Sequence, residues 1–367
     1  MIGRRHVQAG FAVLAKPLTV HSLPIHIQLE PIRGCNLRCI SCGGAKESGR
    51  MEFSTFRKIL DRLNPINITL SGIGEPLMNH EIYQMIEYAE QRGISINLTI
   101  NGTMLNPETA SKLIQSRLSL LSVSLDAAKD ETFEKIRLGA KHSRVVSGLM
   151  ALMEAKRRAG SSLPMLRAQF VLSRLNLPES GEFVRFSKSI GAGAVYFQPL
   201  CLKDSDHHLR NVLINDLSAE ELLHALKTAR TVSGEVHMQS NLTDLIDNFP
   251  LYWKKYVFEE QPKNRKCILP WFSTYITFKG DVIPCCSLNE EAKIGNLFEQ
   301  DFLSIWQGER YRKLRKSFRE GKRPFNICRY CVPVGLGDIL LQKEKFTPGF
   351  LKLFHRAERG QQSNGSV

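Results

Sequence analysis

The sequence predicts an α/β fold with a parallel sheet, because apolar runs alternate with segments of helical periodicity between residues 24 and about 199. Apolar residues at helical spacing are Phe56, Ile59, Leu60 and Leu63, then Ile82, Met85, Ile86 and Ala89, then Val145, Val146, Leu149 and Met153. Short apolar runs follow these segments, as in a parallel sheet with helices outside it. The six runs cover residues 25–29, 66–70, 94–100, 120–125, 166–172 and 195–197. Six strands are fewer than the eight of a closed barrel.

The composition is that of a folded cytoplasmic enzyme. Of its 367 residues, 43% are hydrophobic and 23% charged, so the chain can bury a substantial core and has the length of about two domains. No apolar run approaches the roughly 20 residues that a membrane span requires. The nine cysteines are clustered and odd in number. Together with the absence of a signal peptide, this favours metal binding in a reducing compartment over a disulfide framework.

The net charge of +14 favours anionic partners, such as nucleic acid, an acidic membrane surface or a phosphorylated substrate. Part of the excess lies in the N-terminal extension (1–22) and the C-terminal tail (336–367), where it is interleaved with apolar residues. Peripheral membrane contact through these basic termini is one interpretation. A pair of solvated tails that pack loosely on the body is the other, and it is favoured because such runs are compositional signals only.

Three cysteines, Cys35, Cys39 and Cys42, lie in one short loop after the first predicted strand. Each iron of a four-iron cluster normally takes one thiolate, so three cysteines leave one iron open to another ligand. The Cys-x3-Cys-x2-Cys spacing resembles the signature of radical S-adenosylmethionine (SAM) enzymes. The resemblance implies a 4Fe-4S cluster that chelates SAM through its amino and carboxylate groups, and an open, partial (β/α)6 TIM-like barrel. It also implies a low-potential electron donor such as flavodoxin or ferredoxin.

The resemblance extends to the ends of the second, third and fourth predicted strands, where active sites of such barrels lie. The segment Ser71-Gly72-Ile73-Gly74-Glu75-Pro76 is similar to the family's Gly-Gly-Glu motif, whose backbone meets the SAM amino group. Glycine permits such a close approach of the backbone. The SAM-binding residues implied by the family pattern are Gly72, Gly74, Glu75, Asn101, Ser124 and Arg137. The ordinary alternatives are turns for the glycine and asparagine motifs and a surface position for the arginine.

A second group of cysteines lies near the C-terminus: Cys267, Cys285, Cys328 and Cys331. The stretch from Cys267 to Cys285 resembles the opening β-hairpin of the SPASM and twitch extensions of radical SAM enzymes, and no cysteine follows Cys331. Four thiolates suffice for one auxiliary 4Fe-4S cluster with every iron occupied by protein. A structural zinc site is the rival interpretation, since four-cysteine sites of this type are common in zinc ribbons. The roles of Cys286 and Cys201 stay open.

These patterns predict five segments. They are an N-terminal extension (1–22), the radical SAM core barrel (23–215), a mostly helical connector (216–262), a small SPASM/twitch-like hairpin-plus-helix domain with the auxiliary cluster (263–335), and a basic tail (336–367). The connector is expected to pack the small domain against the barrel. Arg167, which opens the fifth strand, is expected to be solvated, as charged residues near strand ends usually are.

The family chemistry implies reductive cleavage of SAM to a 5′-deoxyadenosyl radical, which removes hydrogen from an unreactive C–H bond. Because a fully ligated second cluster cannot bind substrate, it is expected to accept an electron, giving a net two-electron oxidation by an oxidoreductase. The substrate is expected to be a small hydroxylated molecule, by analogy of domain layout. The alternatives are maturation of a peptide or protein, and a non-catalytic metal-ribbon module that binds nucleic acid through its charge. The spread of SAM motifs makes nucleic acid unlikely as a partner.

Overall fold

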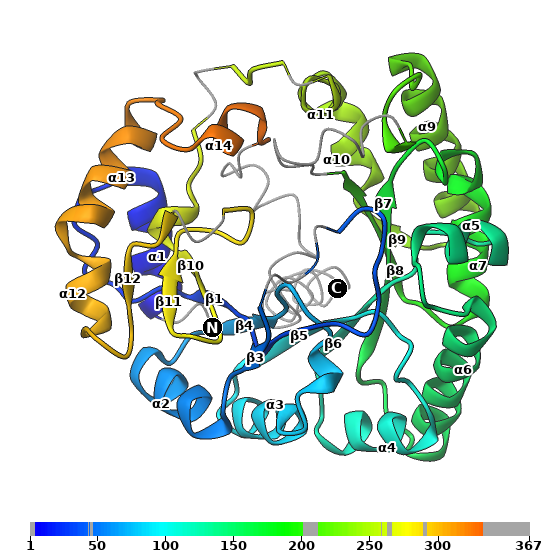
Figure 1. The fold of residues 1–367 in the computed structure, drawn as a ribbon, viewed down its shortest axis with the longest axis horizontal. Coiled ribbons are helices and arrows are strands. Elements are labelled where there is room, and N and C mark those ends of the chain that lie inside the picture. Colours follow the sequence, from blue (N-terminus) through cyan, green and yellow to red (C-terminus); the bar gives the residue numbers. More distant parts are fainter. Residues whose placement is uncertain are drawn as a thin grey trace, which may run out of the picture.

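The computed structural model describes residues 4–332 apart from residues 43, 45–46, 201–211, 258, 263–265 and 289–291. Within these residues, a sheet of ten strands curves around the middle of the molecule and helices lie on its outer side (Figure 1). The strand order is β12-β11-β10-β1-β4-β5-β6-β7-β8-β9. A separate two-stranded sheet pairs β2 (Ile32–Arg33) with β3 (Gly49–Arg50), on either side of the first cysteine loop.

Six neighbouring parallel strands form the middle of the large sheet and confirm the predicted series. They are β1 (His26–Leu29), β4 (Asn67–Leu70), β5 (Ser95–Ile100), β6 (Leu120–Ser124), β7 (Met165–Leu172) and β8 (Ala194–Pro199). Side chains alternate between the two faces, as β5 shows: Ile96 and Leu98 are buried, whereas Asn97 and Thr99 are only half-buried. The apolar residues pack toward the helices, so the polar ones line the barrel interior.

Helices cover the outer side of these strands. They are α2 (Phe53–Leu63), α3 (Ile82–Gln91), α4 (Pro107–Gln115), α5 (Asp130–Ile136), α6 (His142–Arg158) and α7 (Ser180–Ser189), with short 3-10 turns at η1 (Pro76–Met78) and η2 (Leu177–Glu179). Apolar spacing correctly predicts α2, α3 and α6, whose Phe56, Ile86 and Leu149 are fully buried. It does not predict α4 or α5, because each buries only two apolar residues, too few to establish a repeating pattern.

The predicted C-terminal hairpin continues the barrel sheet. Strand β10 (Ser273–Ile276) pairs in parallel with β1, and β11 (Asp281–Ile283) and β12 (Gly295–Asn296) follow in antiparallel pairing. At the other edge, β9 (Gln239–Ser240) pairs in parallel with β8. The sequence predicts a partial barrel followed by a small hairpin-plus-helix domain, and both parts are present. Their joining in one sheet was not predicted.

The connector contains α9 (Ala219–Glu235), α10 (Leu242–Asp247) and α11 (Phe249–Tyr256), and it contacts both the barrel and the C-terminal domain. Helix α9 packs on barrel helix α7 through its buried apolar face. The hydroxyl of Tyr256 donates to the Leu172 carbonyl at 3.0 Å and accepts from the Leu200 amide at 3.1 Å. The Gln261 amide donates to the Arg329 carbonyl at 2.8 Å. These contacts are those expected of a connector that holds the small domain against the barrel.

The N-terminal extension is not a loosely packed tail. It forms α1 (Arg4–Ala15), and side chains of the C-terminal domain hold the chain that follows this helix. Besides its strands, the C-terminal domain contains η4 (Leu269–Trp271), α12 (Phe302–Trp306), α13 (Glu309–Arg319) and α14 (Asn326–Tyr330). Trp271 Nε1 donates to the Pro17 carbonyl at 2.8 Å, and Trp306 Nε1 donates to that of Ser22 at 3.0 Å. The buried Arg315 donates to the Leu18 carbonyl at 3.2 Å. The C-terminal tail (336–367) lies outside the described residues.

Among the described residues, none of the helices has both the length and the apolar character needed to cross a bilayer. Membrane contact through the termini stays a prediction.

Candidate active site

The first cysteine loop lies beyond the carboxyl end of β1, at the edge of the sheet where the sequence places the active site. The loop is fastened to the end of α5: the Arg38 amide donates to the Leu138 carbonyl, and the Ile40 amide donates to that of Ile136, both at 3.0 Å. Cys35 and Cys42 are exposed and Cys39 is half-buried. The loop therefore presents its thiols from a fixed backbone.

Hydrogen-bond donors surround these sulfur atoms. The Leu37 amide lies 3.4 Å from Cys35 Sγ, and Asn101 Nδ2 lies 3.7 Å from the same atom. Arg137 Nη1 lies 3.8 Å from Cys39 Sγ. Burial raises the pKa of the Cys39 thiol, Arg137 opposes the rise, and the nearby Cys42 and Cys35 add to it. The three sulfurs thus share one electrostatic environment in which bound cationic iron would relieve their repulsion.

The segment 72–76 is fitted against the start of the cysteine loop. The Gly34 amide donates to the Ile73 carbonyl at 3.3 Å, and the Glu75 amide donates to the Gly34 carbonyl at 3.0 Å. A Cβ on Gly74 would lie 2.5 Å from the Ile32 carbonyl oxygen, and one on Gly72 would lie 2.5 Å from the side chain of Glu30. Glycine is therefore required at both positions for packing within the protein, a reason that the sequence alone does not give.

Glu75 is fully buried, and its carboxylate oxygens bind backbone amides within the protein. Oε1 accepts from the Leu77 amide at 3.1 Å and Oε2 accepts from the Asn101 amide at 2.6 Å. Burial raises the pKa of Glu75 to about 7, against the effect of these two hydrogen bonds. The geometry makes Glu75 a positioning residue that joins the loop after β4 to the end of β5.

Asn101 holds the cysteine loop from the end of β5. Its Nδ2 donates to Asn36 Oδ1 at 2.9 Å, and Asn36 Nδ2 donates to Thr103 Oγ1 at 2.8 Å. Asn101 Oδ1 in turn accepts from the amide and the hydroxyl of Thr103. Asn36, which lies between the first two cysteines, is a site residue that the sequence analysis did not identify.

Arg137 is buried beside Cys39 and is held by one carboxylate. Its Nη2 lies 2.5 Å from Asp126 Oδ2, while Asp126 Oδ1 accepts from the Val171 amide at 2.7 Å. Asp126 adopts a left-handed backbone conformation, with φ of 63°. Within the described residues, Arg137 Nε is buried without a hydrogen-bond partner. Asp126 thus orients the guanidinium beside the cysteine loop, and its role in binding SAM stays a prediction.

Ser124, at the end of β6, is half-buried, and its hydroxyl donates to Gln169 Oε1 at 3.3 Å. Five of the six predicted SAM-site residues thus lie in segment 72–76 or contact the cysteine loop. They are Gly72, Gly74, Glu75, Asn101 and Arg137. Ser124 lies at the same sheet edge but touches the neighbouring strand.

The C-terminal cysteines also form one group. Cys285 follows β11, Cys328 lies in α14, Cys331 ends that helix, and Cys267 precedes η4. Burial raises the pKa of the Cys285 thiol, and the nearby Cys286, Cys267 and Cys331 raise it further. Burial, and then Cys331, raises the pKa of Cys328 to about 11. Cys286 is exposed and close to the group, and Cys201 lies outside the described residues.

Both thiol groups fit iron-sulfur clusters in their chemistry. In the part of the chain that the structure describes, no three ligand-type side chains gather tightly enough to bind a single ion together. A cubane does not require this, because each thiolate binds its own iron. Three thiols in one group and four in the other match a cluster with one open iron and a cluster with none.

Comparison with known families agrees with this geometry. The profile of the Radical SAM superfamily matches residues 29–167, and that of the SPASM iron-sulfur cluster-binding domain matches residues 267–332. The chain carries a radical SAM domain followed by a SPASM domain. The first domain brings a 4Fe-4S cluster with SAM. The second brings auxiliary iron-sulfur binding, which favours iron over zinc for the C-terminal thiols.

Three relatives are informative. An AdoMet-dependent heme synthase of Methanosarcina barkeri is 26% identical over 331 residues, covering 85% of this chain and 90% of that protein. The mycofactocin maturase MftC of Mycobacterium tuberculosis is 25% identical over 174 residues, 46% of this chain and 43% of that protein. The structure of Streptococcus suis SuiB bound to its precursor peptide SuiA aligns with a TM-score of 0.65 at 14% identity, covering 93% of this chain and 77% of that one. This structural likeness shows a shared fold.

Proposed function

We propose that this enzyme uses the 5′-deoxyadenosyl radical to abstract hydrogen from a small hydroxylated substrate, and that the auxiliary cluster accepts the second electron of a two-electron oxidation. The open cluster, when bound, supplies the electron that cleaves SAM to methionine and this radical. The substrate gives one hydrogen atom to the radical and then loses a proton and an electron. The observation that carries the proposal is the C-terminal group of four thiols, Cys267, Cys285, Cys328 and Cys331, which leaves no iron open to substrate.

The residues around the first cysteine loop would place SAM on the open iron. The backbone of segment 72–76 would meet its amino group, and the charged guanidinium of Arg137 would bind its carboxylate. Asn101 and Ser124 would supply polar contacts to the ribose or carboxylate. Asp126 holds the guanidinium in place, and Glu75 holds the two loops at a fixed separation.

The polarity of the barrel interior supports a hydroxylated substrate. Several half-buried or exposed interior positions along the strands carry amide or hydroxyl side chains, although Val171 on the same face of β7 is apolar. The polar ones are Gln28 on β1, Thr99 on β5, Ser124 on β6, Gln169 on β7 and Gln198 on β8. Such groups can exchange hydrogen bonds with several hydroxyls of a bound molecule. An apolar substrate could not form these hydrogen bonds.

Maturation of a peptide is a second candidate function. The relative MftC is named as a maturase, and the SuiB structure contains a precursor peptide, which favours this alternative. Binding of nucleic acid by a non-catalytic module has no comparable support, because the matched domain is that of an enzyme superfamily.

The chemistry is tested on anaerobically reconstituted protein that is given dithionite and SAM. Release of 5′-deoxyadenosine is expected, and its absence would refute the proposed SAM cleavage on which the whole proposal rests. Deuterated polyols and aminocyclitols are then compared with deuterated synthetic peptides encoded near the gene. Deuterium transfer into 5′-deoxyadenosine from the first set supports oxidation of a small molecule, and transfer only from the second set supports the peptide alternative.

The role of the auxiliary cluster is tested with Cys328→Ser. SAM cleavage should remain measurable while oxidised product is lost, because the substrate radical has no electron acceptor. Cys286→Ser is the matched control, since this exposed thiol is not needed to complete a set of four. Product formation at the normal yield by Cys328→Ser would contradict the electron-acceptor role.

A further inference from the structure

Glu30 is a fully buried carboxylate directly after β1, and it collects hydrogen bonds from three parts of the chain. Arg33 donates to it through Nε at 3.2 Å and through Nη2 at 2.9 Å. The amide of Ile73 donates to Oε1 at 3.0 Å, and the amide of Phe278 lies 3.5 Å from Oε2. The hydroxyl of Tyr275 also hydrogen-bonds to Glu30. A buried carboxylate with this many donors is held in one orientation.

These donors come from segments with different roles. Ile73 belongs to segment 72–76, which packs on the first cysteine loop, and Gly72 lies so close to Glu30 that a Cβ there would reach 2.5 Å from its Cγ. Phe278 belongs to the turn between β10 and β11, and β11 leads directly to Cys285. Glu30 is therefore a direct side-chain link between the proposed SAM loop and the hairpin that carries an auxiliary-site thiol.

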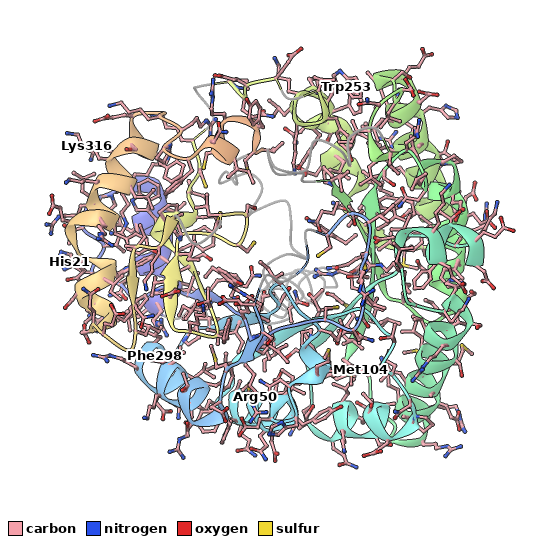
Figure 2. The ribbon with its side chains drawn as sticks, in the orientation of Figure 1. His21, Arg50, Met104, Trp253, Phe298 and Lys316 are labelled. Carbon is pink, nitrogen blue, oxygen red and sulfur yellow. The ribbon has the colours of Figure 1, made fainter. Side chains whose placement is uncertain are left out.

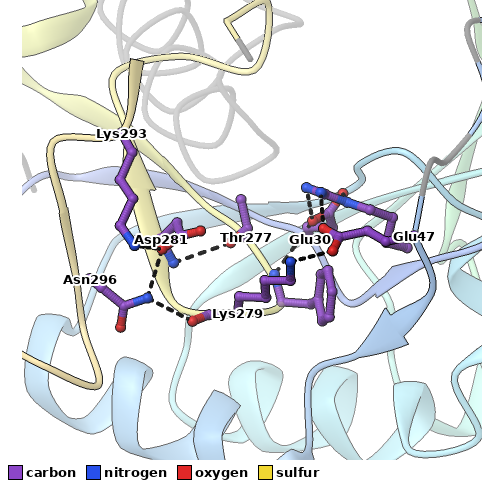
Figure 3. A network of polar contacts seen from close by, with 9 residues as sticks. Glu30, Glu47, Thr277, Lys279, Asp281, Lys293 and Asn296 are labelled. Atoms are coloured by element: carbon purple, nitrogen blue, oxygen red, sulfur yellow. Dashed lines mark hydrogen bonds and ion pairs between the residues drawn. The ribbon is translucent and has the colours of Figure 1, made fainter. Parts of the chain in front are cut away.

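The turn between β10 and β11 is itself fixed from outside the SAM site. Asn296 Nδ2 donates to the Lys279 carbonyl at 2.9 Å and to Asp281 Oδ1 at 2.7 Å (Figure 3). The Asp281 amide donates to Thr277 Oγ1 at 3.1 Å, and Lys293 lies 2.6 Å from the Asp281 carboxylate. Loosening this network would displace the Phe278 amide without altering any residue of segment 72–76.

We propose that Glu30 is a positioning residue that couples the auxiliary-site hairpin to the SAM loop, so that SAM affinity depends on how firmly the hairpin turn is held. The inference rests on the proposed role of segment 72–76 in binding SAM. In Glu30→Gln, one amide hydrogen must face Arg33 in place of a carboxylate oxygen, so the side chain can no longer serve all its donors. Either the amide of Ile73 or the amide of Phe278 then loses its acceptor, so the side-chain link between the SAM loop and the hairpin turn is broken whichever way the new amide turns.

The test is a double-mutant cycle measured by anaerobic calorimetric titration of SAM into the oxidised, cluster-loaded enzyme. Glu30→Gln is expected to raise the Kd for SAM about tenfold, the effect of losing one charge-assisted hydrogen bond. Asn296→Ala is expected to raise it severalfold, and the double variant should bind no more weakly than Glu30→Gln alone. Iron content per chain should stay at the wild-type value. The matched control is Glu52→Gln, which removes an exposed carboxylate paired with Arg50.

Wild-type Kd values in both Glu30→Gln and Asn296→Ala would overturn the inference, and so would strictly additive effects in the double variant. If Glu30→Gln does not fold, Tyr275→Phe removes one donor from Glu30 at almost constant volume and should raise Kd about threefold. An unchanged Kd in that variant would also refute the coupling. If the wild-type enzyme itself does not bind SAM, the proposed function falls and this inference falls with it.

Discussion

His26 is the residue on which the pH stability of the joint between barrel and hairpin depends most clearly. It lies on β1 between β10 and β4, with Nδ1 2.7 Å from Ser273 Oγ and Nε2 3.1 Å from Thr69 Oγ1. Burial lowers the pKa of His26 to about 4. The ordinary pKa of histidine is about 6.5, so the unfolded chain binds this proton over a pH range in which the folded protein does not.

The sign and size of the effect follow from this difference. Because the folded-state pKa is depressed, the stabilisation is fully present above the unfolded-state pKa and is lost as the pH falls toward 4. Between pH 7.5 and pH 5.5, the two titrations give a loss of at most about 1.3 kcal/mol in the free energy of unfolding from this one group. Most of the loss occurs below pH 6.5.

The assay is anaerobic urea unfolding of the cluster-loaded protein, followed by circular dichroism at both pH values. Between pH 7.5 and pH 5.5, the free energy of unfolding should fall by about 1.3 kcal/mol more in wild type than in His26→Asn. This difference does not depend on the absolute stability of the variant. His224→Asn, on the exposed side of α9, is the matched control and should follow wild type. Equal pH dependence in wild type and His26→Asn would refute the argument.

Three further variants test other contacts. Gly74→Ala should weaken SAM binding at least about tenfold in calorimetric titrations, because its Cβ would lie 2.5 Å from the Ile32 carbonyl oxygen. Gly234→Ala, which has open space around it, is the control and should bind SAM normally. Normal SAM binding by Gly74→Ala would contradict the packing argument. Arg137→Lys keeps the charge but loses the planar fork, so the KM for SAM should rise about tenfold with iron content unchanged, and an unchanged KM would remove Arg137 from the SAM site. Tyr256→Phe removes the hydroxyl that pairs with the Leu200 amide and the Leu172 carbonyl. The free energy of unfolding should fall by about 1–3 kcal/mol in urea titrations, and a change within error would show that these two groups find other partners.

Local patterns in the sequence were enough to predict the six barrel strands and helices α2, α3 and α6. The alternation along β5 and the apolar spacing in α2 depend only on neighbouring residues. The pairing of β10 with β1 could not be predicted in this way, because Ser273 and His26 are 247 residues apart in the chain. The same holds for Glu30, whose partner Phe278 lies 248 residues away.

Besides the loosely packed N-terminal tail, the expectation for Arg167 was wrong. Arg167 is 5% exposed rather than solvated; its Nε donates to Ser122 Oγ at 3.1 Å, and its guanidinium lies over the ring of Tyr196 at 5.3 Å. The side chain faces the barrel interior because it alternates along β7 with residues that face the helices. A charged residue at a strand start is solvated only if that face of the sheet is open to water, which the sequence does not show.

The positions of the cysteines were predictable from spacing alone, whereas the residues that orient them were not. Asn36 acts through a contact with Thr103, which follows β5. Asp126 stands out in the sequence only by its place after the fourth strand, and its contact with Arg137 at the end of α5 is seen only in the structure. The sequence does not single out a side chain whose role depends on partners far along the chain. Figure 2 shows how the fold brings such distant segments together: His21, after α1, and Lys316, on α13, lie on the same side of the molecule.

The central claim is that Cys35, Cys39 and Cys42 leave one iron of their cluster open to SAM. The most direct test is electron paramagnetic resonance of the anaerobically reconstituted, reduced Cys328→Ser variant, in which the signal of the first cluster is least overlapped. Addition of SAM should change the g values and line shape of that signal. A spectrum that is identical with and without saturating SAM would contradict the account.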